Sequence, residues 1–101
     1  MRYDKLVRDK IPEKLNQKGE VPITHIADDE EYWEKLKEKL KEEVDEFLEN
    51  NNNEELSDIL DVINTICDFK NIDRDKLEIF RKKKLEEKGG FKNKIILDEV
   101  K

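Results

Sequence analysis

The stretch LKEEVDEFLENNNNEELSDILD, residues 40–61, decides the fold expected of this chain. It predicts the end of one helix, a turn and the start of a second helix, because asparagines tolerate left-handed backbone and cap helices. Each predicted helix has two acidic residues three positions apart: Glu43 and Glu46 before the turn, Glu55 and Asp58 after it. Residues three apart project from neighbouring positions of a helix. An antiparallel hairpin would therefore bring four carboxylates together.

Four converging carboxylates repel one another unless a cation lies among them. Hard oxygen ligands of this kind suit Mg²⁺, or Mn²⁺ as an alternative. The chain has 27 acidic residues among 101, so the same spacings also arise by chance on an ordinary solvated helix surface. The spacing alone leaves both interpretations open.

The composition favours long, solvated helices in a single domain, residues 1–101. Charged residues make up 48% of the chain and hydrophobic residues 35%, with three glycines and two prolines. This mixture is unlike that of a β-sandwich or barrel. It is also compatible with disorder, but the regular spacing of the apolar residues argues against disorder over most of the chain.

Charge and cysteine content narrow the possible partners. The net charge of −6 argues against binding to nucleic acid by general electrostatics. The single cysteine, Cys67, excludes an intramolecular disulfide and is expected to be a buried thiol. The sequence shows no signal peptide and no long apolar run, so we expect a cytoplasmic protein without membrane association.

Capping residues and apolar spacing place the remaining helices. A first helix should start near Ile11, because Pro12 suits a first turn, and should end at Gly19. Asp28 with Glu31 resembles a capping box, which predicts a second helix reaching about Asn50.

The third and fourth helices are predicted over residues 54–69 and 74–88. The third has the most apolar residues and should be the most buried, whereas the fourth should turn three residues inward: Leu77, Phe80 and Leu85. Two β-prone pieces, residues 23–26 and 94–97, could pair with each other. The expected fold class is all-α, about four helices with an antiparallel hairpin and this small β pairing as an addition.

Helical projection places the acidic motifs beside the apolar stripes. Successive residues differ by roughly 100°, so the first residue of each motif lies about 60° from its stripe and the second about 120–130°. Val62 projects between Glu55 and Asp58. An apolar residue there suggests that this flank is covered by another helix or by a partner subunit, and half-buried carboxylates need a counter-charge.

Four stretches in order resemble the MazG-like family of all-α nucleoside triphosphate pyrophosphatases, which includes phosphoribosyl-ATP pyrophosphohydrolase-like proteins. They are KLVRDKIP at 5–12, EEVDEF at 42–47, EELSDILD at 54–61, and KGGF with a following IIL at 88–97. The resemblance spans almost the full chain. The turn between the acidic motifs is short here, which should shorten the hairpin and alter how far a base can enter.

The resemblance implies an enzyme, a metal site and an assembly. It implies metal-dependent hydrolysis of a nucleoside triphosphate to a monophosphate and pyrophosphate, as in house-cleaning of non-standard nucleotides. The family's E-x-x-E and E-x-x-D motifs, which hold Mg²⁺ and form the catalytic site, fall on Glu43, Glu46, Glu55 and Asp58. Relatives assemble as dimers or tetramers, so a homodimer or homotetramer is expected.

Further residues follow from position and chemistry. Glu42 and Asp61 flank the motifs and are expected to orient ligands or water. Phosphate oxygens away from a metal need cations, and arginine offers the two-pronged geometry that phosphate favours. The candidates for phosphate binding are Lys5, Arg8, Lys10, Arg81 and Lys84. The alternative function is a non-catalytic oligomerisation or partner-binding module of the same fold, which uses the acidic rim for contacts.

Overall fold

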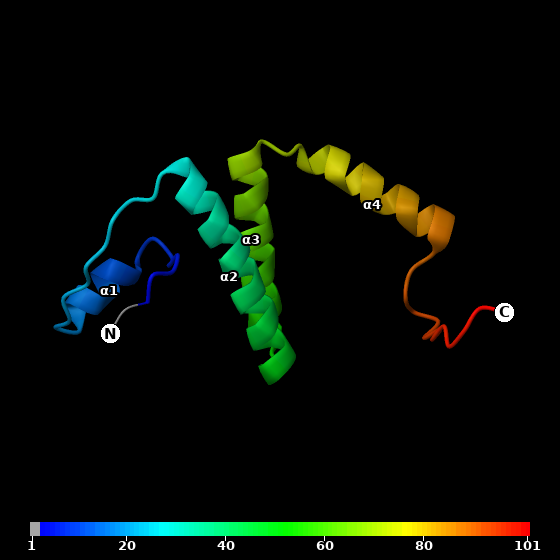
Figure 1. Ribbon diagram of the computed structural model, residues 1–101, viewed down its shortest axis with the longest axis horizontal. Coiled ribbons are helices and arrows are strands. Elements are labelled where there is room, and N and C mark those ends of the chain that lie inside the picture. Colours follow the sequence, from blue (N-terminus) through cyan, green and yellow to red (C-terminus); the bar gives the residue numbers. More distant parts are fainter. Residues whose placement is uncertain (1–2) are drawn as a thin grey trace. The chain divides into compact units, whose positions relative to one another are not determined.

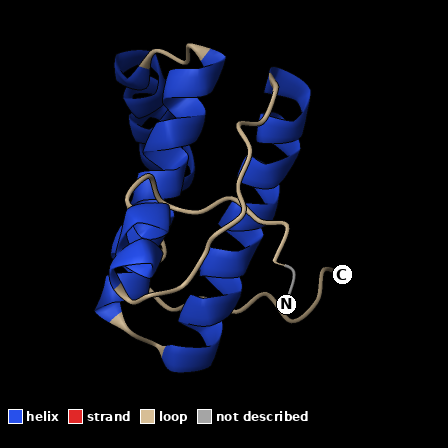
Figure 2. Ribbon diagram, turned by 90° about the vertical axis from the view of Figure 1, so that its left-hand side faces the viewer, coloured by secondary structure: helices blue, strands red, loops and turns tan. Residues whose placement is uncertain are grey.

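The computed structural model describes residues 3–101, and these form four helices joined by loops (Figure 1). The helices are α1 (Ile11–Gln17), α2 (Asp29–Asn50), α3 (Asn53–Lys70) and α4 (Arg74–Lys88). The same part of the chain contains no strand, so every regular element in Figure 2 is a helix. The all-α prediction is confirmed. No helix within residues 3–101 has the length and apolarity to span a membrane.

The chain divides into two compact units, Met1–Ile66 and Cys67–Lys101. The first unit contains α1, α2 and most of α3, and it includes the whole acidic hairpin. The second contains the end of α3, helix α4 and the C-terminal tail.

Local interactions explain where the helices of the hairpin begin and end. The side chain of Asp28 accepts a hydrogen bond of 2.8 Å from the backbone N–H of Glu31 and so caps α2. Asn51 ends α2 in the left-handed region, with φ of 54°, which asparagine tolerates. The Asn52 side chain then accepts from the backbone N–H of Glu54 at the start of α3. The two acidic motifs are thus joined by a very short connection.

The buried line of α2 contains a carboxylate. Leu36 is only 1% exposed, and Glu43, seven residues further on, is 7% exposed. Leu40 and Phe47 continue the same line at helical spacing and are half-buried. Glu43 therefore lies within the packed face of α2, whereas the projection from sequence placed it about 60° to one side.

Helix α3 is turned so that its acidic motif faces inward. Glu55, Asp58 and Ile59 are half-buried and Val62 is buried, so they form its packed face. Leu56, Leu60 and Ile63 lie about 100° around the helix from this face, and they are exposed. The prediction that α3 is the most buried helix is wrong for this stripe, because packing of the carboxylate face turns the leucines outward. Val62, predicted to need a covering helix or subunit, is already buried within one chain.

Two further expectations, on the burial of α4 and on a β pairing, are wrong. Leu77, Phe80 and Leu85 of α4 are exposed, not inward. The predicted pairing of residues 23–26 with 94–97 is wrong, since residues 3–101 contain no strand. The apolar residues of both pieces are exposed, and an isolated ribbon of two four-residue strands is only marginally stable.

Leu36→Ala should cost about 2–5 kcal/mol of unfolding free energy, because a fully buried leucine is replaced by a cavity. Leu48→Ala, the same change at a residue of α2 that is 67% exposed, is the matched control. We expect it to cost less than about 0.5 kcal/mol in a monomer. Urea unfolding monitored by circular dichroism measures both values. Equal losses would contradict the burial of Leu36.

Candidate metal centre

Three carboxylates from the two helices of the hairpin converge. Each of Glu43, Glu55 and Asp58 offers an oxygen, and these oxygens all lie within 4.8 Å of one another. Glu43 belongs to α2 and the other two to α3. The arrangement follows from the short turn, which brings the end of α2 and the start of α3 together.

Glu43 is the buried member of these three carboxylates. One of its oxygens, Oε1, lies 3.5 Å from Lys39 Nζ, but the buried Oε2 has no hydrogen-bond partner within residues 3–101. A buried carboxylate oxygen without a partner is costly. A cation bound here would give this oxygen its missing partner, and two further carboxylates lie next to it to bind the same cation.

The donor set fits a hard divalent cation. Carboxylate oxygens are the preferred ligands of Mg²⁺ and Mn²⁺. Octahedral Mg²⁺ holds oxygens at about 2.1 Å, so opposite ligands lie about 4.2 Å apart. Neighbouring ligands lie about 3.0 Å apart, so binding one ion requires the three oxygens, which lie within 4.8 Å of one another, to close this gap. Glu55 and Asp58 are only half-buried, so small side-chain rotations suffice to close it.

Glu46 lies in the electrostatic field of the cluster without belonging to the closest three. Partial burial and the negative charge of Glu43 raise the pKa of the Glu46 carboxyl above its ordinary value. The charges of Glu42 and Glu55 act in the same direction. Glu46 therefore binds a proton more readily than an ordinary glutamate does.

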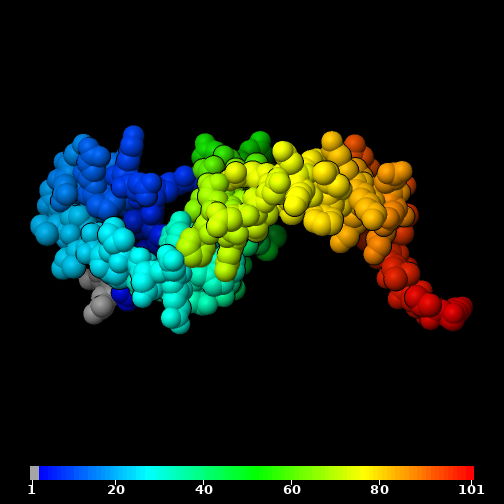
Figure 3. Space-filling model, turned by 90° about the horizontal axis from the view of Figure 1, so that it is seen from above, coloured from blue at the N-terminus to red at the C-terminus, as the bar shows by residue number. Residues whose placement is uncertain are grey.

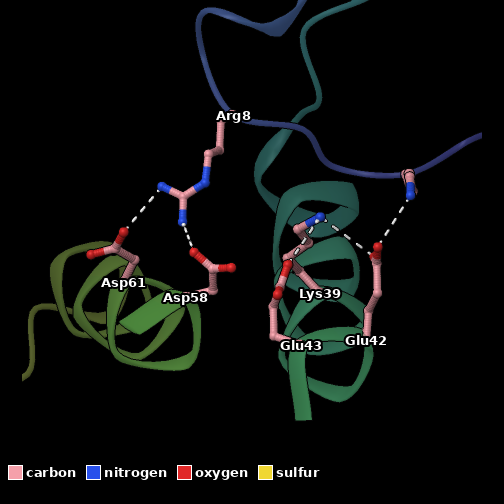
Figure 4. Close-up of polar contacts among 7 residues, drawn as sticks. Arg8, Lys39, Glu42, Glu43, Asp58 and Asp61 are labelled. Carbon is pink, nitrogen blue, oxygen red and sulfur yellow. Dashed lines mark hydrogen bonds and ion pairs between the residues drawn. The ribbon is translucent and has the colours of Figure 1, made fainter. Parts of the chain in front are cut away.

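An arginine from the N-terminal segment bridges two acids of α3 (Figure 4). Arg8 donates from Nη2 to Asp58 Oδ1 at 2.8 Å and from Nη1 to Asp61 Oδ2 at 3.0 Å. The hydrogen bond to Asp61 is the largest cause of a raised Arg8 pKa; desolvation opposes it, and the charge of Asp58 adds to it. The guanidinium is therefore charged whenever the acids are.

Two lysines neutralise the acids of α2. Lys5 donates to Glu42 at 3.1 Å, and Lys39 lies 3.5 Å from both Glu42 and Glu43. Burial acts to raise the pKa of Glu42, but the hydrogen bond from Lys5 and the charge of Lys39 lower it overall. Figure 3 shows the N-terminal residues, in blue, beside the hairpin that these contacts join them to.

The charges at the site do not balance. Six carboxylates face three cations, which leaves a formal surplus of three negative charges. The carboxylates are Glu42, Glu43, Glu46, Glu55, Asp58 and Asp61, and the cations are Lys5, Arg8 and Lys39. A divalent cation would remove most of this surplus.

The structure brings together most of the residues selected from the sequence. The four motif acids, the flanking Glu42 and Asp61, and the cations Lys5 and Arg8 are all part of one cluster of contacts. The sequence analysis missed Lys39 and Asn50; Asn50 donates to Glu55 at 3.1 Å. Lys39 could have been found by its spacing, four residues before Glu43.

Three predicted phosphate-binding residues are not part of this cluster. Lys10 is exposed, and its ammonium has no polar contact among residues 3–101. Arg81 donates from Nε to Glu78 at 2.9 Å, and Lys84 is exposed on the same helix. Both lie in the second unit, so the cluster is formed without them.

No enclosed nucleotide pocket is found along the acidic face of α2. The hollow there has a volume of about 410 Å³, opens to solvent and is lined only by residues of α2. Its rim includes Glu42 and Glu46, so it adjoins the cluster. A single chain offers a nucleotide a charged surface here and little apolar enclosure.

Comparison with known proteins leaves the family undetermined. The chain is 48% identical over 42 residues to an uncharacterized protein of Mycolicibacterium smegmatis (strain ATCC 700084 / mc(2)155). The match covers 42% of this chain and 43% of the relative, so it spans less than half of either protein. No protein-family model matches the chain, and no solved structure matches it.

Glu46→Gln should raise the melting temperature of the metal-free protein at pH 7. Because folding raises the Glu46 pKa, ionisation of this carboxyl destabilises the fold as pH rises through that pKa. The gain should vanish below the ordinary carboxyl pKa, where wild-type Glu46 is protonated in both states. Calorimetry in chelator at pH 7 and at about pH 3.5 tests this.

Glu38→Gln is the control for this measurement, because Glu38 is an exposed residue of α2 that pairs with Lys35 at 3.2 Å. It should leave the melting temperature unchanged or lower it slightly at pH 7. A loss of stability in Glu46→Gln at pH 7 would mean that Glu46 is not strained by its neighbours.

Proposed function

We propose that the chain is a metal-dependent nucleoside triphosphate pyrophosphohydrolase, which cleaves between the α and β phosphates and releases a nucleoside monophosphate and pyrophosphate. The observation that carries the proposal is the convergence of Glu43, Glu55 and Asp58, with a buried and unpartnered oxygen on Glu43. The resemblance of the acidic motifs to the MazG-like family supports the same activity. The substrate class is that of non-standard nucleotides removed by house-cleaning enzymes.

The acidic residues would hold the cation and handle the proton. Glu43, Glu55 and Asp58 are the ligands for Mg²⁺ or Mn²⁺, and Glu46 lies next to them. Such an ion would lower the pKa of a bound water and would stabilise negative charge on the leaving pyrophosphate. The raised pKa of Glu46 suits it to accept the proton of the attacking water, because it brings the base nearer to neutral pH.

Cations of the N-terminal segment would hold the phosphates that extend beyond the metal. Arg8 and Lys5 already lie at the rim of the acidic cluster, bonded to Asp58 and Glu42. A triphosphate offers the same kind of oxygen acceptors at higher charge. Lys10, Arg81 and Lys84 are further candidates, with Arg81 and Lys84 in the second unit.

A second copy of the chain would complete the site as a homodimer or homotetramer. Leu56, Leu60 and Ile63 form an exposed apolar stripe on α3, and the hollow beside Glu46 is open. An exposed stripe of this kind marks an interaction surface. A second copy packed on this stripe would bury the apolar area that one chain leaves in water. It would also help to enclose the open hollow.

Glu43→Gln and Asp58→Asn should each lower pyrophosphate release by at least about a hundredfold, because each removes a charged ligand of the cation. The assay is pyrophosphate release from a panel of canonical and modified nucleoside triphosphates, with Mg²⁺ or Mn²⁺ and with chelator. Glu34→Gln is the control, since Glu34 is exposed on α2 outside the hollow beside Glu46 and pairs with Lys37. It should keep wild-type rates.

Two results would contradict the enzyme proposal. One is release that persists in chelator; the other is silence of the wild-type protein across a panel that includes phosphoribosyl-ATP. In the second case the rival function, a helical module that binds partners through its acidic rim, becomes the better explanation. That module predicts no change in melting temperature with Mg²⁺ beyond the change caused by sodium at matched ionic strength.

Leu60→Lys should dissociate the assembly, because it places a charge in the centre of the exposed stripe of α3. Light scattering after gel filtration should show the mass of a dimer or tetramer for the wild type and of a 12.2 kDa monomer for the variant. Ile23→Lys makes the same change at a residue that is 97% exposed outside the hairpin, and it should leave the mass unchanged. A monomeric wild type would contradict the assembly.

A further inference from the structure

Arg8 and the metal site compete for the same acid. Asp58 contributes an oxygen to the three-carboxylate cluster, and its Oδ1 also accepts the 2.8 Å hydrogen bond from Arg8 Nη2. A divalent ion at Asp58 would neutralise the negative charge of this carboxylate and would repel the guanidinium of Arg8. Asp61 is not one of the three converging carboxylates, so its 3.0 Å hydrogen bond from Arg8 Nη1 faces no such competition.

The geometry lets one of these bonds change while the others persist. The backbone carbonyl of Arg8 accepts from the N–H of Ile11 at 3.1 Å, at the start of α1, which fixes the main chain. Lys5 holds the same segment to Glu42 on α2. The Arg8 side chain is 57% exposed, so its outer end can rotate without disturbing the core.

We propose that Arg8 couples metal loading to phosphate binding, with Asp61 as its fixed anchor and Asp58 as the partner it exchanges. In the metal-free chain Arg8 is the counter-charge of Asp58. When the cation occupies Asp58, Nη2 is released beside the metal and donates to a phosphate group, while Nη1 stays on Asp61. Asp61 is thus a positioning residue, and this inference rests on the proposed function.

The exchange has opposite effects on the two ligands, and this distinguishes it from a merely structural role. Without Arg8, the cation no longer has to displace an ion pair or bind beside a positive charge, so it should bind more tightly. Phosphate, by contrast, loses a charged donor and should bind more weakly. A damaged fold would weaken both.

The experiment measures binding and does not depend on turnover. Titration calorimetry would be run on the full chain with Mn²⁺ alone, and then with pyrophosphate at saturating Mg²⁺. For Arg8→Gln we expect Mn²⁺ affinity to rise about three- to tenfold and pyrophosphate affinity to fall about ten- to a hundredfold.

Two variants refine the test and one controls it. Arg8→Lys keeps the charge but cannot span two acids, so it should restore the wild-type Mn²⁺ affinity and only part of the pyrophosphate affinity. Asp61→Asn weakens the anchor and should weaken pyrophosphate binding while leaving Mn²⁺ binding at Asp58 no tighter than in the wild type. Arg74→Gln removes an arginine of the second unit that pairs with Asp68 at 2.7 Å, and it should change neither affinity.

The outcomes separate the two proposals. Equal or weaker Mn²⁺ binding by Arg8→Gln, or unchanged pyrophosphate binding, overturns the coupling and leaves the metal-dependent activity standing. Absence of Mn²⁺ binding by the wild-type chain removes the proposed function and the coupling with it. The coupling is supported if Arg8→Gln binds Mn²⁺ more tightly and pyrophosphate more weakly than the wild type does, while Arg74→Gln binds both with unchanged affinity.

Discussion

The repulsion between carboxylates on α2 and α3 is the constraint on which this structure depends. The helices pack along a face that includes Glu43, Glu55 and Asp58, where an ordinary hairpin would place only apolar side chains. Neighbouring negative charges oppose this packing unless positive charge is supplied. Lys39 supplies part of it from within α2, and Lys5 and Arg8 supply a further part from the N-terminal segment. The position of that segment is therefore a consequence of the acidic hairpin.

The same constraint explains the orientation of α3. Once its acidic motif faces α2, helical periodicity directs Leu56, Leu60 and Ile63 away from the packed face. The helix then has two distinct uses, one for charge within the chain and one for apolar contact outside it. The convergence of the three carboxylates and the exposure of the apolar stripe thus follow from a single rotation of one helix.

Helix positions could be predicted from the sequence because their signals are local. Asp28, the asparagines at the turn and Asp73 cap helices through contacts a few residues away, and the helices begin and end close to the predicted residues. Spacing and a short turn also predicted that the motif acids converge, and three of the four do: Glu43, Glu55 and Asp58. The rotation of α3 and the partners of Arg8 could not be predicted, because they depend on contacts across about 50 residues of chain and on the total charge of the site.

Helix α3 has little surface on which substitutions would be neutral. On one face of its 18 residues, acidic side chains pack against α2. A second face exposes apolar side chains. Asp61, which binds Arg8, constrains a third direction. Mutational drift in this helix should therefore be confined to a narrow strip of positions such as Glu54 and Ser57, even though most of its residues are accessible to solvent.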